Sequence, residues 1–187
     1  MKKLVLFASG AGSNVENIIK YFKDRSDVTI AAVFTNKPDA GVVDKAQLYN
    51  IPVVISAKPD LENGSAFAEV NRFSPDLIVL AGFLLKFPSA IISAYPNKVV
   101  NIHPALLPKY GGKGMYGMNV HKAILENNEA ETGISIHYVN EHYDEGAIVF
   151  QEKVDVSDCD SPEQIAARVR KLEHEHFPLV IEKLLFS

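Results

Sequence analysis

The chain alternates short apolar runs with segments that carry apolar residues at helical spacing, and this alternation constrains its fold more than any other feature. Residues 4–8 form the first run, and after a glycine-containing turn the apolar residues recur at i, i+3, i+4 and i+7 over residues 15–22. Further cycles follow as far as residue 103. Runs that are apolar throughout are typical of strands buried on both faces. The sequence therefore predicts an α/β fold of Rossmann-like type, a mostly parallel twisted sheet with helices on both faces.

The pattern changes in the second half of the chain. A stretch rich in Gly and Pro, residues 104–118, interrupts the alternation. Residues 132–139 and 147–156 both look extended and are joined by a loop, which predicts a late antiparallel strand pair. A last helix begins in Ser161-Pro162-Glu163-Gln164, a capping-box pattern. Within residues 1–103 we expect strands at 4–8, 28–35, 51–55, 77–81 and 98–103, and helices at 15–22, 40–49, 61–73 and 88–95.

Composition narrows the class of protein. With 187 residues, 47% hydrophobic and 22% charged, the chain is expected to form one domain, residues 1–187. The formal charge of −4 gives no general attraction to nucleic acid or to anionic membranes. The apolar stretch after Lys3 is too short for a signal peptide. Cys159 is the only cysteine, so an intrachain disulfide and a zinc site of several thiolates are excluded, and we expect a cytoplasmic protein.

The turn after the first predicted strand could bind an anion. Gly10, Gly12, Ser13 and Asn14 lead into a helix, whose free N–H groups and positive dipole end favour a phosphate. The third glycine of a dinucleotide-binding fingerprint would fall on Val15, and no acidic residue follows at the expected distance. A single phosphate therefore suits the turn better than NAD. The alternative is a turn that only packs the helix against the sheet.

Asn101-Ile102-His103-Pro104, at the end of the fifth predicted strand, is the most informative segment. Residues i and i+2 of a strand share a face, so Asn101 and His103 project together. An amide can donate to an oxygen that gains negative charge, and an imidazole can move protons, as acyl transfer to an amine requires. The alternative is a buried histidine with a satisfied hydrogen bond.

A histidine in this role needs a carboxylate partner. The loop of residues 140–146 offers Glu141, Asp144 and Glu145. A carboxylate facing His103 would raise its pKa and stabilise the imidazolium. The pattern does not choose among the three carboxylates, and a solvated acidic turn is the alternative.

Four motifs, in order and at family spacing, resemble the folate-dependent formyltransferases over essentially the whole chain. The Asn-x-His-Pro-x-Leu-Leu-Pro block is typical of the superfamily. The glycine turn and residues 168–178 resemble the branch that acts on glycinamide ribonucleotide. The motifs are Ser9-Gly10-Ala11-Gly12-Ser13-Asn14, Leu80-Ala81-Gly82-Phe83, Asn101-Ile102-His103-Pro104-Ala105-Leu106-Leu107-Pro108 and Asp144-Glu145-Gly146.

The resemblance implies that the chain moves the formyl group of 10-formyltetrahydrofolate, a co-substrate, to the amine of glycinamide ribonucleotide in purine biosynthesis. It implies that Asn101 donates to the oxyanion, His103 carries the proton and Asp144 raises the pKa of His103. It also implies a phosphate site, a folate wall and a carboxylate beside the glycinamide. These are Gly12, Ser13 and Asn14 for the phosphate; Phe83, Leu84, Leu85, Lys86 and Phe87, with Asn101 and main chain of the Asp144 loop, for the folate; and Glu173 for the glycinamide.

Several alternatives share parts of this pattern. Methionyl-tRNA formyltransferases are longer chains with a basic RNA-binding domain, and formyltetrahydrofolate deformylases typically carry an additional N-terminal domain. We therefore expect neither of these two activities. A formyltransferase for another amine, or a non-catalytic nucleotide-binding module, remains an alternative. Glu173-His174-Glu175-His176 suggests metal ligands, but histidines two apart do not share a helix face, so we expect no metal site. The expected partners are small molecules, not nucleic acid or a membrane, for a monomer or a homodimer.

Overall fold

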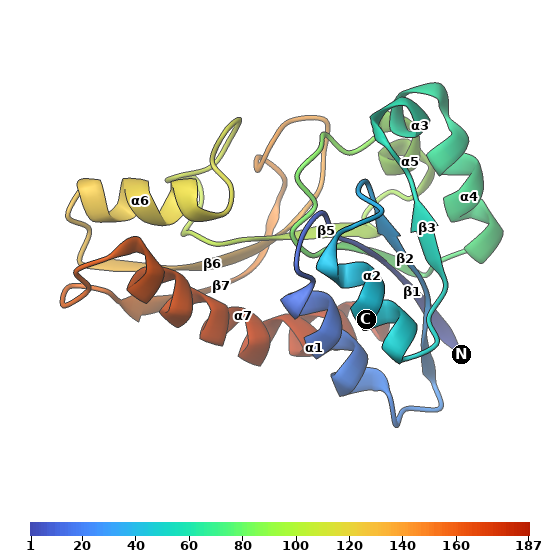
Figure 1. Cartoon of the computed structure of the whole chain (residues 1–187), viewed down its shortest axis with the longest axis horizontal. Coiled ribbons are helices and arrows are strands. Elements are labelled where there is room, and N and C mark those ends of the chain that lie inside the picture. Colours follow the sequence, from blue (N-terminus) through green and yellow to red (C-terminus); the bar gives the residue numbers. More distant parts are fainter.

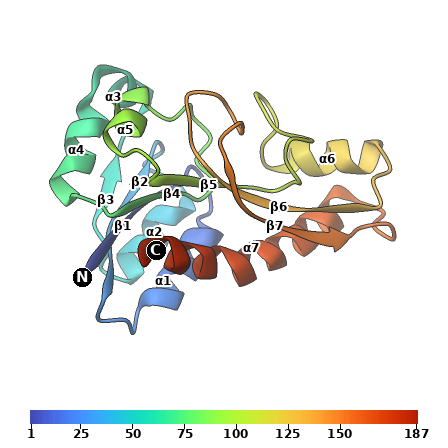
Figure 2. The same cartoon turned by 180° about the vertical axis from the view of Figure 1, so that it is seen from behind.

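The computed structural model describes residues 1–187 and places seven strands in one sheet (Figures 1 and 2). The strands are β1 (Lys2–Phe7), β2 (Val28–Thr35), β3 (Val53–Ile55), β4 (Leu77–Leu80), β5 (Val99–His103), β6 (Glu131–Tyr138) and β7 (Ile148–Asp155). Their order is β3-β2-β1-β4-β5-β6-β7. All neighbours from β3 to β5 are parallel, whereas β6 is antiparallel to both β5 and β7. The predicted parallel sheet with a late antiparallel pair is confirmed.

Side chains of β1 alternate between the two faces of the sheet. Leu4 and Leu6 join the larger hydrophobic core, and Val5 and Phe7 join the smaller one on the other face. The Phe7 ring stacks on that of Phe34 at 4.7 Å between centroids. Helices α1, α2, α6 and α7 contribute to the larger core and α4 and α5 to the smaller. The helices are α1 (Ser13–Phe22), α2 (Gly41–Leu48), α3 (Lys58–Asn63), α4 (Ser65–Phe73), α5 (Ser89–Ala94), α6 (Met118–Glu126) and α7 (Pro162–Leu185).

One helical prediction was wrong in detail, and one helix was not predicted. The helix expected at 61–73 is two helices, α3 and α4, because Gly64 between them adopts a left-handed conformation with φ of 88°. Helix α6 was not predicted. Its buried residues Val120 and Ile124 are four apart, which is a helical signal, but they follow directly on the glycine-rich stretch that interrupts the alternation.

The start of α7 follows the predicted capping pattern only in part. The Ser161 side chain accepts a hydrogen bond from the Gln164 amide, as predicted. The Gln164 side chain accepts from the backbone of Asp160 at 2.8 Å, one residue before the capping serine. The helix then runs for 24 residues and contains an internal proline, Pro178.

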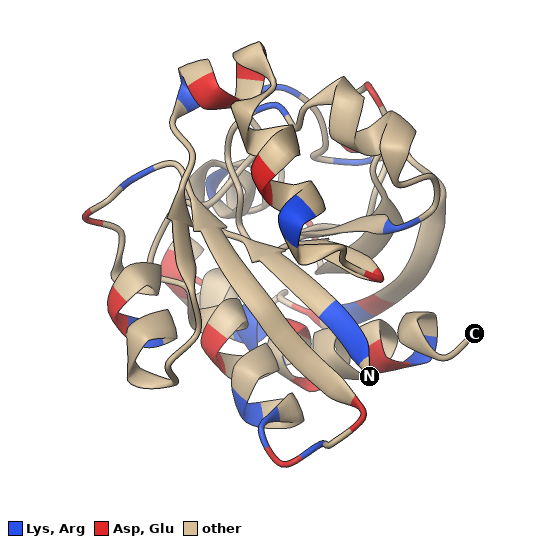
Figure 3. Cartoon of the chain, turned by 90° about the vertical axis from the view of Figure 1, so that its right-hand side faces the viewer, with Lys and Arg blue, Asp and Glu red and all other residues tan.

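Basic and acidic residues are interspersed along the helices and strands on the side of the molecule shown in Figure 3. None of the seven helices combines the length and the apolar character that crossing a membrane requires.

Candidate active site

A cleft of about 690 Å³ opens at the carboxyl ends of the central strands, the place where open α/β sheets bind ligands. Segments that are far apart in the sequence line it: the turn before α1, the segment after β4, the end of β5, the loop before α6, the loop between β6 and β7, and one face of α7. Every residue predicted for the site lies in its lining: Gly12, Ser13, Asn14, Phe83, Leu84, Leu85, Lys86, Phe87, Asn101, His103, Asp144 and Glu173.

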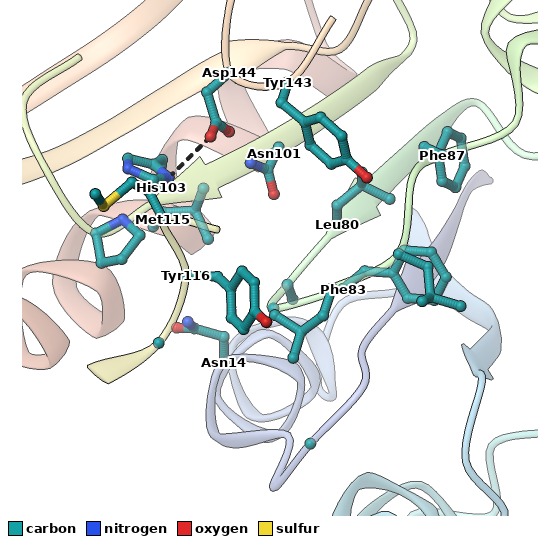
Figure 4. Close-up of a pocket in the computed structure, with 18 of the residues that line it drawn as sticks. Asn14, Leu80, Phe83, Phe87, Asn101, His103, Met115, Tyr116, Tyr143 and Asp144 are labelled. Atoms are coloured by element: carbon teal, nitrogen blue, oxygen red, sulfur yellow. Dashed lines mark ion pairs between the residues drawn. The ribbon is translucent and has the colours of Figure 1, made fainter. Parts of the chain in front are cut away.

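Asn101 and His103 project from β5 toward the same side, as the strand periodicity predicted. In Figure 4 they gather with Asp144, while Asn14 and Tyr116 lie across the cleft. In the antiparallel register with β6, Asn101 lies opposite His137. The amide nitrogen Nδ2 of Asn101 is 3.1 Å from Nε2 of His137.

His103 is held at both ring nitrogens. Nε2 lies 2.7 Å from the carbonyl oxygen of Tyr110, and Nδ1 lies 3.5 Å from Oδ2 of Asp144 (Figure 4). A carbonyl oxygen only accepts, so Nε2 carries a hydrogen and donates it to Tyr110. Nδ1 is then the atom at which the ring can gain or lose a proton, with a carboxylate beside it to balance the resulting charge.

The net pKa shift of His103 is opposite to the prediction. Burial lowers the pKa of His103 below its ordinary 6.5, and this effect outweighs the raising effects of Asp144 and of the Tyr110 carbonyl, while His137 lowers it further. The predicted influence of Asp144 is present, but desolvation of a side chain in a residue only 3% exposed is larger. The consequence is a neutral imidazole at pH 7, which can accept a proton.

Asp144, which the family resemblance implied and the loop pattern alone did not select, is the carboxylate that faces His103. Its side chain is 12% exposed, and Oδ1 lies 3.5 Å from Nε2 of His137. Oδ2 accepts a hydrogen bond from the amide of Gly112 at 3.0 Å. Burial by itself would raise the pKa of Asp144, but the neighbouring rings of His137 and His103 and the hydrogen bond from the Gly112 amide together lower it. Asp144 is therefore an anion between two histidines, whereas Glu141 and Glu145 are exposed.

The turn before α1 has the geometry of an anion cradle. Gly12 has φ of 70°, and a Cβ atom there would lie 2.6 Å from the Val42 side chain, so only glycine fits. No side chain caps the N-terminus of α1, which leaves its first amide N–H groups free. Asn14 donates through Nδ2 to Oε2 of Glu173 at 3.0 Å, and its buried Oδ1 has no hydrogen-bond partner within the chain.

Glu173 reaches this turn from α7. Burial raises the pKa of Glu173, and the bond from Asn14 and the charge of Arg170 oppose that rise. Arg170 lies three residues earlier on the helix and also lines the cleft. It forms no ion pair with another side chain, so it is a cation available to an anionic ligand.

The predicted folate wall is anchored on the first strand. Phe83 and Phe87 contact the Phe7 ring edge-on, with centroid distances of 5.3 and 5.0 Å. The Leu84 amide donates to Oγ of Ser9 at 3.0 Å. Phe87 is buried, whereas the Leu84 and Lys86 side chains are exposed toward the cleft. The wall therefore offers both apolar surface and a cation.

Among the cleft residues that were not predicted, three carry side chains that bear directly on its chemistry: His137, Arg170 and His121. His137 lies on a predicted strand, but its pairing with Asn101 depends on the register of β5 and β6. Arg170 could have been found from its spacing to Glu173. His121 lies on the unpredicted helix α6. No group of three or more His, Cys, Asp or Glu side chains is arranged to hold a metal ion.

Comparison with known proteins identifies the family. The formyl transferase family model matches residues 2–181. The chloroplastic phosphoribosylglycinamide formyltransferase of Arabidopsis thaliana is 40% identical over 96% of this chain, which spans only 64% of that protein. The phosphoribosylglycinamide formyltransferase of Bacillus subtilis is 35% identical over 99% of this chain and 95% of its own length. The chain belongs to the formyl transferase family.

A solved structure supports the same assignment for the fold of this formyl transferase. The crystal structure of phosphoribosylglycinamide formyltransferase from Bacillus halodurans superposes with a TM-score of 0.89 at 31% identity. The similarity covers 98% of this formyl transferase and 95% of that chain. The sheet order, including antiparallel β6, is therefore the fold of the family.

Proposed function

We propose that this formyl transferase moves the formyl group of 10-formyltetrahydrofolate to the glycinamide amine of N1-(5-phospho-D-ribosyl)glycinamide. The products are the N2-formyl compound and tetrahydrofolate, and the reaction is a step of de novo purine biosynthesis. The names of the relatives support the acceptor and the formyl transfer, and membership of the formyl transferase family supports the folate donor. The observation that carries the proposal is that Asn101, His103 and Asp144 share one cleft with a phosphate-type turn.

The proposed chemistry is direct transfer. The amine nitrogen attacks the formyl carbon, forming a C–N bond and placing negative charge on the formyl oxygen. One N–H of the Asn101 amide faces His137, so the second N–H is available to that oxygen. The bond from carbon to N10 of the folate then breaks as the oxygen re-forms its double bond.

His103 carries the proton in this scheme. Its neutral Nδ1 accepts a proton from the attacking nitrogen and returns it to the folate nitrogen that leaves. The Tyr110 carbonyl fixes the ring, so only Nδ1 exchanges protons. Asp144 at 3.5 Å stabilises the imidazolium between the two transfers, because opposite charges then face each other in a buried site.

The binding residues follow from the same cleft. We propose that the amides of Gly12, Ser13 and Asn14 hold the phosphate, with Glu173 beside the glycinamide. We assign the folate to the wall of residues 83–87, to Asn101 and to the main chain of the Asp144 loop. Residues 1–187 act as one formyltransferase domain. Cys159 is buried and unpaired, which supports a reducing compartment such as the cytoplasm.

The test is a formyl-transfer assay with 10-formyltetrahydrofolate and three acceptors: glycinamide ribonucleotide, water alone, and charged initiator tRNA. We expect turnover that depends on the ribonucleotide. Ribonucleotide-independent hydrolysis would instead identify a deformylase. Turnover only with the charged tRNA would assign a different amine as the acceptor while leaving the transfer chemistry unchanged. No reaction with any acceptor would favour a non-catalytic module.

A further inference from the structure

Helix α7 contains a break in its hydrogen bonding next to a residue of the cleft. Pro178 lies inside the helix and has no N–H, so it cannot donate to the carbonyl oxygen of the residue four positions earlier, His174. A buried carbonyl oxygen that loses its partner costs free energy unless another donor replaces it. The residue before His174 is Glu173, which lines the cleft.

Asn17 of α1 replaces the missing donor. Its Nδ2 donates to the carbonyl oxygen of His174 at 2.8 Å. Asn14, three residues earlier and on the same face of α1, donates to Oε2 of Glu173 at 3.0 Å. Further along this face the Tyr21 hydroxyl donates to Glu182, beyond the proline. Helix α1 is therefore bonded to α7 on both sides of the break and at the break itself.

We propose that Asn17 is a positioning residue for the acceptor substrate, acting through the His174 carbonyl to fix Glu173 in the cleft. Asn17 is absent from the cleft lining, so it reaches substrate only through α7. A helix with a missing bond is free to bend at that point, and the bond from Asn17 sets the bend. The Glu173 carboxyl, partly buried and held by the single bond from Asn14, depends on that bend for its place.

The proposal rests on the proposed function and predicts which kinetic constant changes. The phosphate turn and Glu173 lie on either side of the α1–α7 contact, whereas the proposed folate wall is built on β1 and residues 83–87. A shift of α7 against α1 therefore disturbs the acceptor side of the cleft. Asn101, His103 and Asp144 stand on β5 and the β6–β7 loop and keep their geometry.

The experiment is a double-mutant cycle with Asn17→Ala and Pro178→Ala, measuring kcat and the KM of each substrate. We expect Asn17→Ala to raise the KM for the ribonucleotide three- to tenfold, with the KM for 10-formyltetrahydrofolate within twofold of wild type. Pro178→Ala returns an N–H to the helix, so in that background Asn17→Ala should change the ribonucleotide KM less than twofold. Asn17→Asp, which keeps the size of the side chain and loses the donor, should resemble Asn17→Ala.

Lys20→Ala is the matched control, because Lys20 is on α1 but pairs with Glu16 at the surface. An equal effect of Asn17→Ala in both backgrounds would show that Asn17 does not act through the carbonyl. An unchanged ribonucleotide KM in Asn17→Ala, or an equal rise for both substrates, would also overturn the proposal. The wild-type protein tests the proposed function separately: no ribonucleotide-dependent turnover in wild type would mean that the proposed function itself is wrong.

Discussion

The amide nitrogen of Asn101 lies 3.1 Å from Nε2 of His137, across the antiparallel pairing of β5 and β6. Nδ1 of His137 lies 2.9 Å from the carbonyl oxygen of Tyr138, which can only accept, so Nδ1 carries a hydrogen. The amide nitrogen of Asn101 can only donate, so Nε2 of His137 is the acceptor in this pair. His137 thereby fixes the orientation of the Asn101 amide, whose second N–H remains available to the cleft.

This relationship predicts that His137→Leu lowers kcat, because the Asn101 amide loses its orienting partner and Asp144 loses a neighbour at 3.5 Å. We expect kcat to fall about tenfold. That is less than the ~10²–10³-fold typical of removing an oxyanion donor itself. Steady-state kinetics of His137→Leu and Asn101→Ala provide the comparison. His176→Leu is the control, since that ring packs on Phe150 away from the cleft. Wild-type kcat in His137→Leu would contradict the orienting role.

Asp144→Asn should slow the reaction and change its pH dependence. The substitution keeps the size of the side chain, and asparagine tolerates the left-handed backbone conformation at this position, where φ is 56°. It removes the charge that balances the imidazolium, for which a loss on the order of 10²-fold or more is expected. Because Asp144 raises the pKa of His103, its removal should move the acidic limb of kcat/KM to lower pH. A full rate, or an acidic limb that moves upward, would contradict this assignment.

His121 should make the fold sensitive to acid. Burial, followed by the charge of Arg170 and the neighbouring His103 ring, lowers the pKa of His121 from 6.5 to about 4, and its Nδ1 has no hydrogen-bond partner. A histidine kept neutral in the fold but free to protonate when unfolded stabilises the protein above pH 6.5. That contribution, roughly 3 kcal/mol, is lost as the pH falls from 6.5 through 4.

His121→Leu removes this titration and fills the same buried position with an apolar side chain. We expect the free energy of unfolding to fall less between pH 7 and pH 4 in the variant than in wild type. Urea unfolding at several pH values measures it. An identical pH dependence in both proteins would show that His121 is not the group responsible.

Gly12→Ala tests the phosphate turn. The left-handed conformation and a contact of 2.6 Å with Val42 both oppose a side chain, so we expect destabilisation of about 1–3 kcal/mol and a raised KM for the ribonucleotide. Gly10→Ala is the matched control in the same turn, because a Cβ atom there meets nothing within 4 Å and its φ is not positive. Chemical denaturation and substrate titration of both variants provide the comparison. Similar KM values for the two would argue against the cradle at Gly12.

The sequence by itself determined the features that depend on neighbouring residues. Continuous apolar runs identified the parallel strands, and Gly10, Gly12 and the helix after them identified the turn. Asn101 and His103 were placed on one face because side chains i and i+2 of a strand always share a face. Helix α6 was missed because the glycines before it give the same local signal as a loop, and the break at Gly64 was missed because an isolated glycine is also tolerated inside a helix.

Only the tertiary structure decided the features that depend on distant segments. Asn101 and His137 are 36 residues apart, and Asn14 and Glu173 are 159 apart, so the packing of the strands and helices sets their distances. The choice of Asp144 over its neighbours depends on how the β6–β7 loop closes over β5. The lowered pKa of His103 has the same origin, since the water excluded from a side chain depends on everything packed around it and not on the residues beside it in the chain.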